Sequence, residues 1–278
     1  MADFFTGRGP GRPGLTLFLN AGDPALDELA EVVHMLDEEG VDCLELAVPF
    51  PDSFTDGPVV RRSARRALDR GTGLDDVLGF VARVRPGLRR LRIALLADWS
   101  HSLKHRDLGA AVKDVTASGA DGLLVHGLPP RLRDAYREAT EAAGTAVVTT
   151  CYPTSPEETR ARAARESSAY VYLVAHYGRS GTAPPAGHAA LAPVVAGLRA
   201  HTNSPIAVGF GVSTRNHVAA VAASGADAAI VGSAGVARVE QALDEEGSVT
   251  TALRDFVRSL QPGPDETSTA NTPIRTRS

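Results

Sequence analysis

Short apolar runs alternate along the chain with longer segments in which apolar residues recur every three or four positions. Each run is nearly continuous in its apolar character, which is typical of parallel strands buried on both faces. The eight runs span residues 15–20, 43–48, 91–97, 122–127, 146–151, 170–175, 205–211 and 228–233.

The segments between the runs have the spacing of amphipathic helices. In residues 24–40 the apolar side chains share one helical face, and Gly40 marks its end. Residues 131–144 and 213–225 show the same pattern. Eight strands alternating with helices over about 250 residues predict a single (β/α)8 TIM barrel, which we place at residues 14–261. An open doubly wound sheet is the alternative, but no GxGxxG follows the first run.

The two ends of the chain lack this periodicity. Residues 1–13 are rich in Gly, Pro and Arg, and residues 262–278 are polar and contain prolines. We therefore expect a flexible N-terminal tail and a disordered C-terminal tail.

Composition excludes several classes of function. The 278 residues are 43% hydrophobic and 22% charged, as in an ordinary globular protein, and the net charge is −4. This balance argues against a nucleic-acid partner and against a polybasic membrane binder. No apolar run reaches the roughly 18 residues of a membrane span. Cys43 and Cys151 lie in apolar runs and are expected to be reduced thiols of a cytoplasmic protein, with a disulfide as the alternative.

Lysine is rare in this chain. Lys104 and Lys113 are the only two, and neither lies in a predicted strand. A Schiff-base enzyme needs a lysine in a desolvated site, so we do not expect imine chemistry.

The densest group of acidic residues lies in and after the second run. Glu45 interrupts an apolar strand, where a carboxylate is costly unless it is hydrogen-bonded, paired or functional. Burial would raise its pKa toward neutrality, which suits a proton donor and acceptor. The alternative is an outward-facing or salt-bridged residue. Asp52 and Asp56 follow on the loop, where aspartates beside Gly and Pro are commonly turn formers.

Glycine-containing turns follow three of the late runs, at residues 177–182, 209–213 and 231–235. Such turns, with a helix N-terminus beyond them, present backbone N–H groups to a phosphate, and Ser233 adds a hydroxyl. Plain strand-to-helix turns are the alternative for each one taken singly.

Several histidines fall at predicted strand ends. His126 closes the fourth run, His176 follows the sixth, and Asp98 and His101 follow the third. Together they could bind a divalent metal at one rim of the barrel, but their spacing has no HxH or HExxH pattern. We therefore do not expect a metal site here.

Five motifs together resemble the alpha subunit of tryptophan synthase, the indole-3-glycerol-phosphate aldolase family. Residues 45–58 read ELAVPFPDSFTDGP, which is similar to the family's E-L-G-x-P-F-S-D-P-x-A-D-G-P. The other matches are NAGDP (20–24) to A-G-D-P, YLVAHYGRSG (172–181) to Y-L-x-S-x-x-G-V-T-G, GFGVS (209–213) to G-F-G-I-S, and VGSAGV (231–236) to V-G-S-A-I-V. The likeness runs from about residue 15 to residue 245.

The resemblance implies a TIM barrel that cleaves indole-3-glycerol phosphate to indole and glyceraldehyde 3-phosphate without a cofactor. It implies that Glu45 is the general acid/base and that Asp56 is its partner at the indole nitrogen. Further substrate contacts are expected from Tyr172, Phe18, Asp98 and His126, and phosphate contacts from Gly181, Gly211, Gly232 and Ser233. The implied partners are the small phosphorylated indole substrate and the beta subunit of tryptophan synthase.

The chain also departs from the family pattern. Residues 97–100 read ADWS where the family has Y-A-N, and residues 126–129 read HGLP where it has D-x-P. Pro51 and Ser53 alter the loop that contacts the beta subunit in the family, so we expect a stand-alone enzyme or a weak complex. The family's N-terminal helix is missing or reduced to the tail. Two alternatives follow: a related lyase with a different phosphorylated substrate, and a non-catalytic regulatory subunit that binds a phosphorylated ligand.

Overall fold

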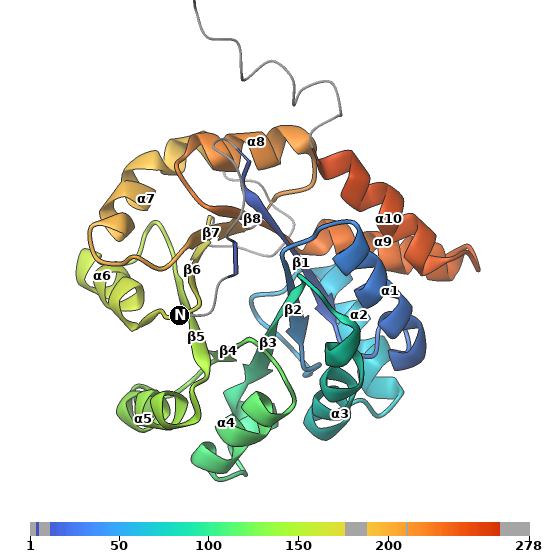
Figure 1. Ribbon diagram of the computed structural model, residues 1–278, viewed down its shortest axis with the longest axis horizontal. Helices are drawn as coiled ribbons and strands as arrows, with labels where there is room; N and C mark the ends of the chain where they lie inside the picture. The colour runs from blue at the N-terminus through green and yellow to red at the C-terminus, as the bar shows by residue number, and fades with distance from the viewer. Residues whose placement is uncertain (1–3, 6–11, 176–187, 210, 262–278) are drawn as a thin grey trace, which may run out of the picture.

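The computed structural model describes residues 4–5, 12–175, 188–209 and 211–261. Its eight strands are parallel, pair in sequence order and close into a barrel where β8 meets β1 (Figure 1). The strands are β1 (Gly14–Asn20), β2 (Cys43–Ala47), β3 (Arg92–Asp98), β4 (Gly122–His126), β5 (Ala146–Cys151), β6 (Tyr170–Val174), β7 (Ile206–Gly209) and β8 (Ala228–Val231). The predicted TIM barrel is confirmed, and each apolar run coincides with a strand to within two residues.

Helices form the outer layer around the barrel (Figure 1). They are α1 (Leu26–Glu38), α2 (Pro58–Asp69), α3 (Leu74–Val84), α4 (Leu108–Ala117), α5 (Arg133–Ala143), α6 (Glu157–Glu166), α7 (Ala192–Arg199), α8 (Arg215–Ala223), α9 (Ser233–Asp244) and α10 (Val249–Leu260). Short turns lie at η1 (Arg85–Gly87), η2 (Trp99–Leu103), η3 (Pro130–Leu132) and η4 (His188–Leu191). The three helices predicted from periodicity are α1, α5 and α8.

Alternation along each strand separates the side chains that face the helices from those that face the barrel interior. On β2, Leu44 and Leu46 pack in the main core between the barrel and the helices. Cys43 belongs instead to a second core cluster inside the barrel. Glu45 lies two residues further along the same face, and its backbone pairs in register with Phe18 of β1. The strand therefore directs a carboxyl group into the barrel.

The interior core includes two residues that precede the first strand. Phe4 is 2% exposed and Phe5 is 8% exposed, and both pack in the cluster that contains Cys43 and Tyr170. The short blue segment that holds them lies within the ring of strands (Figure 1). At these two positions the expectation of a flexible tail is wrong, because the rings are buried. Residues 262–278 lie outside the described residues.

The two cysteines are free thiols, and both are buried. The expectation of unpaired core cysteines is confirmed. In the described part of the chain, every helix is too short or too polar to cross a bilayer.

Candidate active site

A cavity of about 320 Å³ opens at the carboxyl ends of the strands. This is the end at which TIM-barrel enzymes carry their chemistry. Eight of the residues predicted for the site line it: Phe18, Glu45, Asp56, His126, Tyr172, Gly211, Gly232 and Ser233. Asp98 lies behind the wall rather than in it, and Gly181 lies outside the described residues.

Glu45 supplies a neutralisable carboxyl group to this cavity. Its side chain is buried, with the residue 2% exposed, and the Tyr170 hydroxyl donates a hydrogen bond to Oε1 over 2.7 Å. Burial raises the pKa of Glu45 to about 7, and the hydrogen bond from Tyr170 opposes only part of that rise. Near neutral pH the carboxyl therefore exists in both protonation states, which suits a group that both gives and takes a proton.

Asp56 brings a second carboxyl group from the loop between β2 and α2. The residue is half-buried, and burial raises its pKa. A hydrogen bond from the Ser53 side chain and the nearby charges of His126 and Arg61 act against this rise. The two carboxyl groups thus differ in surroundings, since Glu45 is enclosed by the barrel and Asp56 is supported by polar neighbours.

The opposite part of the cavity, after β7 and β8, is suited to an anion. Helix α9 begins at Ser233, and the first N–H groups of a helix have no partners within that helix. The Ser233 hydroxyl is buried and has no hydrogen-bond partner among the described residues. Gly211 takes a φ of +72°, a left-handed conformation that favours glycine, and it lines the cavity beside this helix. A phosphate here would satisfy the hydroxyl and the helix N–H groups together.

The remaining wall, from β3 to β6, is largely apolar. Leu96 and Leu124 line it together with Thr150, Tyr152 and Tyr172. Tyr172 fits closely because β7 has glycine at the neighbouring position: a Cβ on Gly209 would lie 2.6 Å from the tyrosine hydroxyl oxygen. This part of the cavity can hold a flat aromatic group.

A hydrogen-bonded group of side chains supports the rim at β3 and β4. The Asp98 carboxylate contacts Nδ1 of His101 at 2.7 Å and Nδ1 of His126 at 3.1 Å. Burial raises the pKa of Asp98, but the hydrogen bonds of the two histidines outweigh it and hold the pKa below its ordinary value. The Phe50 ring stacks on both imidazoles. Asp98 thus fixes His126, which leaves Nε2 as the ring nitrogen free of this contact.

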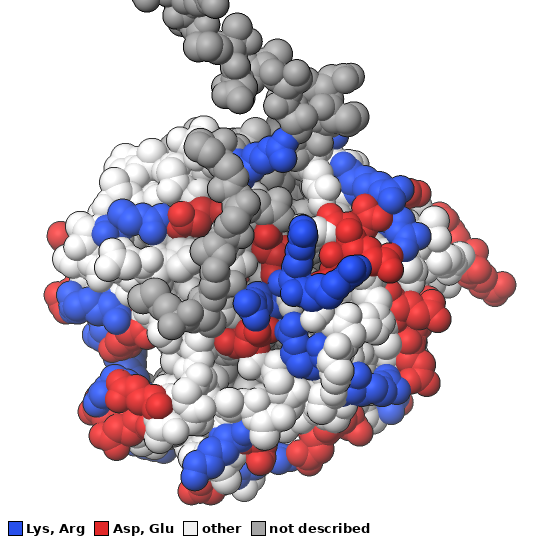
Figure 2. All heavy atoms as spheres, viewed as in Figure 1, with Lys and Arg blue, Asp and Glu red and all other residues white. Residues whose placement is uncertain are grey.

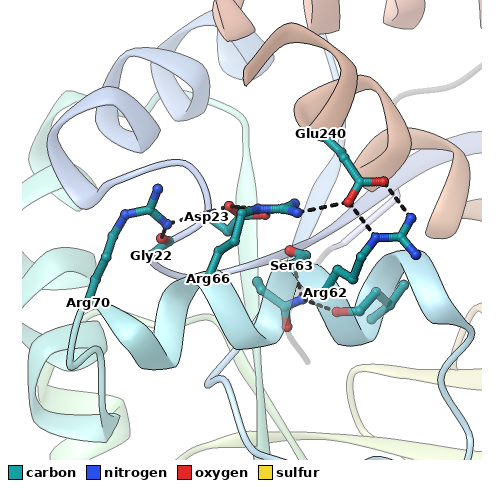
Figure 3. Close-up of polar contacts among 9 residues, drawn as sticks. Gly22, Asp23, Arg62, Ser63, Arg66, Arg70 and Glu240 are labelled. Atoms are coloured by element: carbon teal, nitrogen blue, oxygen red, sulfur yellow. Dashed lines mark hydrogen bonds and ion pairs between the residues drawn. The ribbon is translucent and has the colours of Figure 1, made fainter. Parts of the chain in front are cut away.

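An ion network joins the first loop to the helices on either side of the site. Arg66 of α2 donates two hydrogen bonds to Asp23 and a third to Glu240 of α9, and Arg62 makes two more to Glu240 (Figure 3). The hydrogen bonds from Arg62 and Arg66 to Glu240 lower the pKa of Glu240 to about 2. On the face in Figure 2, Lys and Arg side chains gather beside Asp and Glu near the middle. The network holds together α2, which follows the Asp56 loop, and α9, which begins at Ser233.

Sequence reasoning missed three residues that shape the site: Tyr170, Tyr152 and Phe50. Strand alternation contained the signal for Tyr170, because a residue two positions before Tyr172 faces the same interior. Phe50 gave no such signal, since it lies on a loop whose path depends on the whole barrel. Among the described residues, no group of three or more His, Cys, Asp or Glu could hold a metal ion. His176, considered for such a group, lies outside them.

A closed β/α barrel with a neutralisable carboxyl, a second carboxyl and an anion-binding helix terminus defines an acid–base enzyme for a phosphorylated substrate. Residues 4–263 match the family model described as tryptophan synthase alpha chain. The chain is 36% identical over 257 residues to the tryptophan synthase alpha chain of Cyanothece sp., with 92% of each chain covered. It is 40% identical over 244 residues to that of Gloeobacter violaceus, with 88% of this chain and 87% of the relative covered.

Solved structures give the same result. A mutant tryptophan synthase alpha subunit from Pyrococcus furiosus superimposes with a TM-score of 0.79 at 28% identity, covering 90% of this chain and 98% of that one. Mycobacterium tuberculosis tryptophan synthase gives a TM-score of 0.78 at 28% identity, covering 91% and 94%. The chain belongs to the tryptophan synthase alpha chain family.

Proposed function

We propose that this chain is a carbon–carbon lyase that cleaves indole-3-glycerol phosphate to indole and glyceraldehyde 3-phosphate. Its membership of the alpha chain family supports this reaction and does not favour the two alternatives, a different phosphorylated substrate and a non-catalytic role. The observation that carries the proposal is Glu45, a carboxyl group buried inside a barrel with a pKa of about 7 and directed into a cavity with an anion-binding end.

Glu45 and Asp56 divide the proton chemistry. Protonated Glu45 gives its proton to carbon 3 of the indole ring, and Asp56 accepts a hydrogen bond from the ring N–H and stabilises the positive charge that develops there. The Glu45 carboxylate then takes the proton of the side-chain hydroxyl while the carbon–carbon bond breaks. The electron pair of that bond returns to the ring, which leaves as indole, and the side chain becomes the aldehyde. Glu45 ends protonated, as it began, and the reaction uses no cofactor.

The two ends of the cavity would orient the substrate across these carboxyl groups. Ser233, Gly232 and Gly211 would hold the phosphate at the start of α9, and the apolar wall with Tyr172 and Phe18 would hold the indole ring. His126, fixed by Asp98, would contact the ring edge beside Asp56. Because the phosphate and the indole ring would bind at opposite ends of the cavity, carbon 3 would be held within reach of Glu45. Remote binding energy contributes to catalysis in this way.

A beta subunit is the partner we propose for this chain, in place of the stand-alone enzyme or weak complex that the altered loop led us to expect. One similar structure is described as the tryptophan synthase a2b2 complex of Pyrococcus furiosus, with a TM-score of 0.77 at 27% identity. Phe54, on the loop that contacts the beta subunit in the family, is 97% exposed and is a large apolar side chain available to a partner. We also propose a cytoplasmic location, because both thiols are unpaired.

Incubation of the purified chain with indole-3-glycerol phosphate, with indole measured by chromatography, tests the proposal. The wild type is expected to release indole, and Glu45→Gln and Asp56→Asn to lose activity by about 10²–10⁴-fold. Glu31→Gln, on the exposed face of α1, is the matched control and should retain full activity. Intact substrate after long incubation with excess wild-type enzyme, alone and with a beta subunit, would reject the reaction. Wild-type rates in both carboxyl variants would reject the assigned roles.

A further inference from the structure

The floor of the barrel, directly below the catalytic carboxyl, is closed by two aromatic rings. The centroids of the Phe4 and Phe5 rings lie 5.3 and 5.4 Å from the centroid of Tyr170, each in an edge-on arrangement. Tyr170 in turn donates its hydroxyl hydrogen to Glu45 over 2.7 Å. A continuous chain of contacts therefore runs from Phe4 and Phe5 through Tyr170 to Glu45.

Two glycines on the strands make room for these rings. A Cβ added to Gly14 of β1 would lie 2.5 Å from Cδ1 of Phe5, and one added to Gly122 of β4 would lie 3.0 Å from Cζ of Phe4. The Gly14 distance lies below the 3.0 Å under which real Cβ atoms essentially never approach another atom, and the Gly122 distance lies at that limit. The rings thus fill a space that the strand sequence leaves open, and their burial is a packed arrangement rather than a loose contact.

The titratable groups around Glu45 indicate how a closed floor would affect its protonation. Among the described residues, the titratable groups that interact with its charge are Tyr170 and Tyr172 of β6 and Cys43 of β2. Burial raises the pKa of all three well above their ordinary values, so they are uncharged near neutral pH. Asp56 lines the same cavity and interacts with Tyr172. Burial is the largest cause of the raised pKa of Glu45, and the Tyr170 hydrogen bond opposes it, so the protonation of Glu45 depends mainly on how much water reaches it.

We propose that Phe4 and Phe5 form an aromatic plug that positions Tyr170 and keeps water from reaching Glu45 through the floor of the barrel. Phe4 and Phe5 are positioning residues, since they act on the catalytic group through Tyr170 and never contact the substrate. The inference rests on the proposed role of Glu45 and adds that residues preceding the first strand tune that role.

The pH dependence of kcat/KM for indole release tests the plug. Protonated Glu45 starts the reaction, so the wild-type rate should fall with a midpoint near pH 7. Phe4→Ala/Phe5→Ala admits water, which lowers the pKa of Glu45 more than a weakened Tyr170 hydrogen bond raises it, because burial is the larger cause of the shift. The midpoint should therefore fall by about one pH unit, which reduces the rate at pH 7.5 about five- to tenfold. Tyr170→Phe removes the donor that stabilises the carboxylate, and should move the midpoint upward.

Controls separate positioning from loss of stability. Phe256→Ala removes a ring of similar burial from α10, outside the plug, and should reduce thermal stability without moving the midpoint. Gly14→Ala displaces the Phe5 ring without altering it, and should lower the midpoint even if the double variant fails to fold. A midpoint that stays at the wild-type pH in folded Gly14→Ala or Phe4→Ala/Phe5→Ala protein would overturn the inference.

A second readout keeps the inference independent of the activity. The carboxyl carbon of Glu45, labelled with carbon-13 and identified by its absence in Glu45→Gln, reports the same titration by NMR. If the wild type releases no indole but the plug variants lower this titration midpoint, the proposed function fails and the plug stands. If indole is released and the midpoint is identical in all variants, the plug fails and the proposed function stands.

Discussion

Glu45→Gln should change how the stability of the protein depends on pH. Folding places this carboxyl in the barrel and raises its pKa from an ordinary 4.5 to about 7. Below pH 4.5 the folded and unfolded chains both hold the proton. Between about pH 4.5 and 7 the folded chain keeps the proton and the unfolded chain loses it, so this group's contribution to stability falls as the pH rises. Above pH 7 both states are charged and the loss is complete.

The size of the effect follows from the pKa difference between the two states. The rise is about 2.5 pH units, and each unit corresponds to about 1.36 kcal/mol, so the wild type loses about 3 kcal/mol from this group between pH 4.5 and 8. Glutamine does not titrate. The free energy of unfolding of Glu45→Gln, relative to the wild type, should therefore improve by about 3 kcal/mol over the same range.

Urea unfolding of both proteins at pH 5, 6, 7 and 8 measures this difference, and the comparison cancels the titration of every other group. A change in the Tyr170 hydrogen bond adds a constant offset and leaves the pH trend intact. If the two stability curves run parallel from pH 5 to 8, then Glu45 titrates equally in the folded and unfolded chains. The carboxyl group would then be in contact with water in the folded chain, and its assignment as a buried proton donor would be refuted.

Three other substitutions probe the cavity and its support. Ser233→Ala removes a hydrogen bond to the phosphate worth about 1.5–3 kcal/mol, so KM should rise roughly 10- to 100-fold with a smaller effect on kcat, and an unchanged KM would contradict the phosphate site. Arg66→Ala leaves the buried Asp23 with only the more distant Arg70, and should lower the free energy of unfolding in denaturant by about 2–3 kcal/mol. The control Arg65→Ala, at an exposed ion pair, should lower it by less than about 1 kcal/mol. Equal losses would show that the network adds no stability. Asp98→Asn and His126→Ala should each raise KM about 5- to 20-fold, and the double variant should be no worse than either one, because the residues act as one unit. Additive effects of the two would contradict that coupling.

The barrel could be predicted from the sequence because its strands carry the clearest pattern in the chain. Strands covered by helices are apolar on both faces, so each appears as a short uninterrupted run. Glu45 stood out for the same reason, since a carboxyl group in such a run needs a structural or functional cause. Ser233 and Gly232 were predicted from a turn motif that begins a helix, where the local sequence is enough to define the geometry.

The features of the fold and the site that could not be predicted from the sequence depend on contacts between different segments of the chain. Phe4 and Phe5 lie among Gly, Pro and Arg residues, a composition typical of a tail, and only the open space beside Gly14 and Gly122 makes them part of the core. Asp98 was expected to contact substrate, but the register of β3 and β4 turns its carboxylate toward His126 instead. Tyr170, which the two rings contact, and His126, which Asp98 contacts, each lie more than 25 residues away from those partners along the chain.

Direct titration of the Glu45 carboxyl group is the measurement closest to the central claim. Carbon-13 NMR of labelled glutamate, with Glu45→Gln to assign the signal, follows the ionisation of this one group in the folded wild type. The structure predicts a midpoint near pH 7, set by burial and moderated by the hydroxyl of Tyr170. A midpoint near 4.5 would place the carboxyl in contact with water and contradict its role as the proton donor.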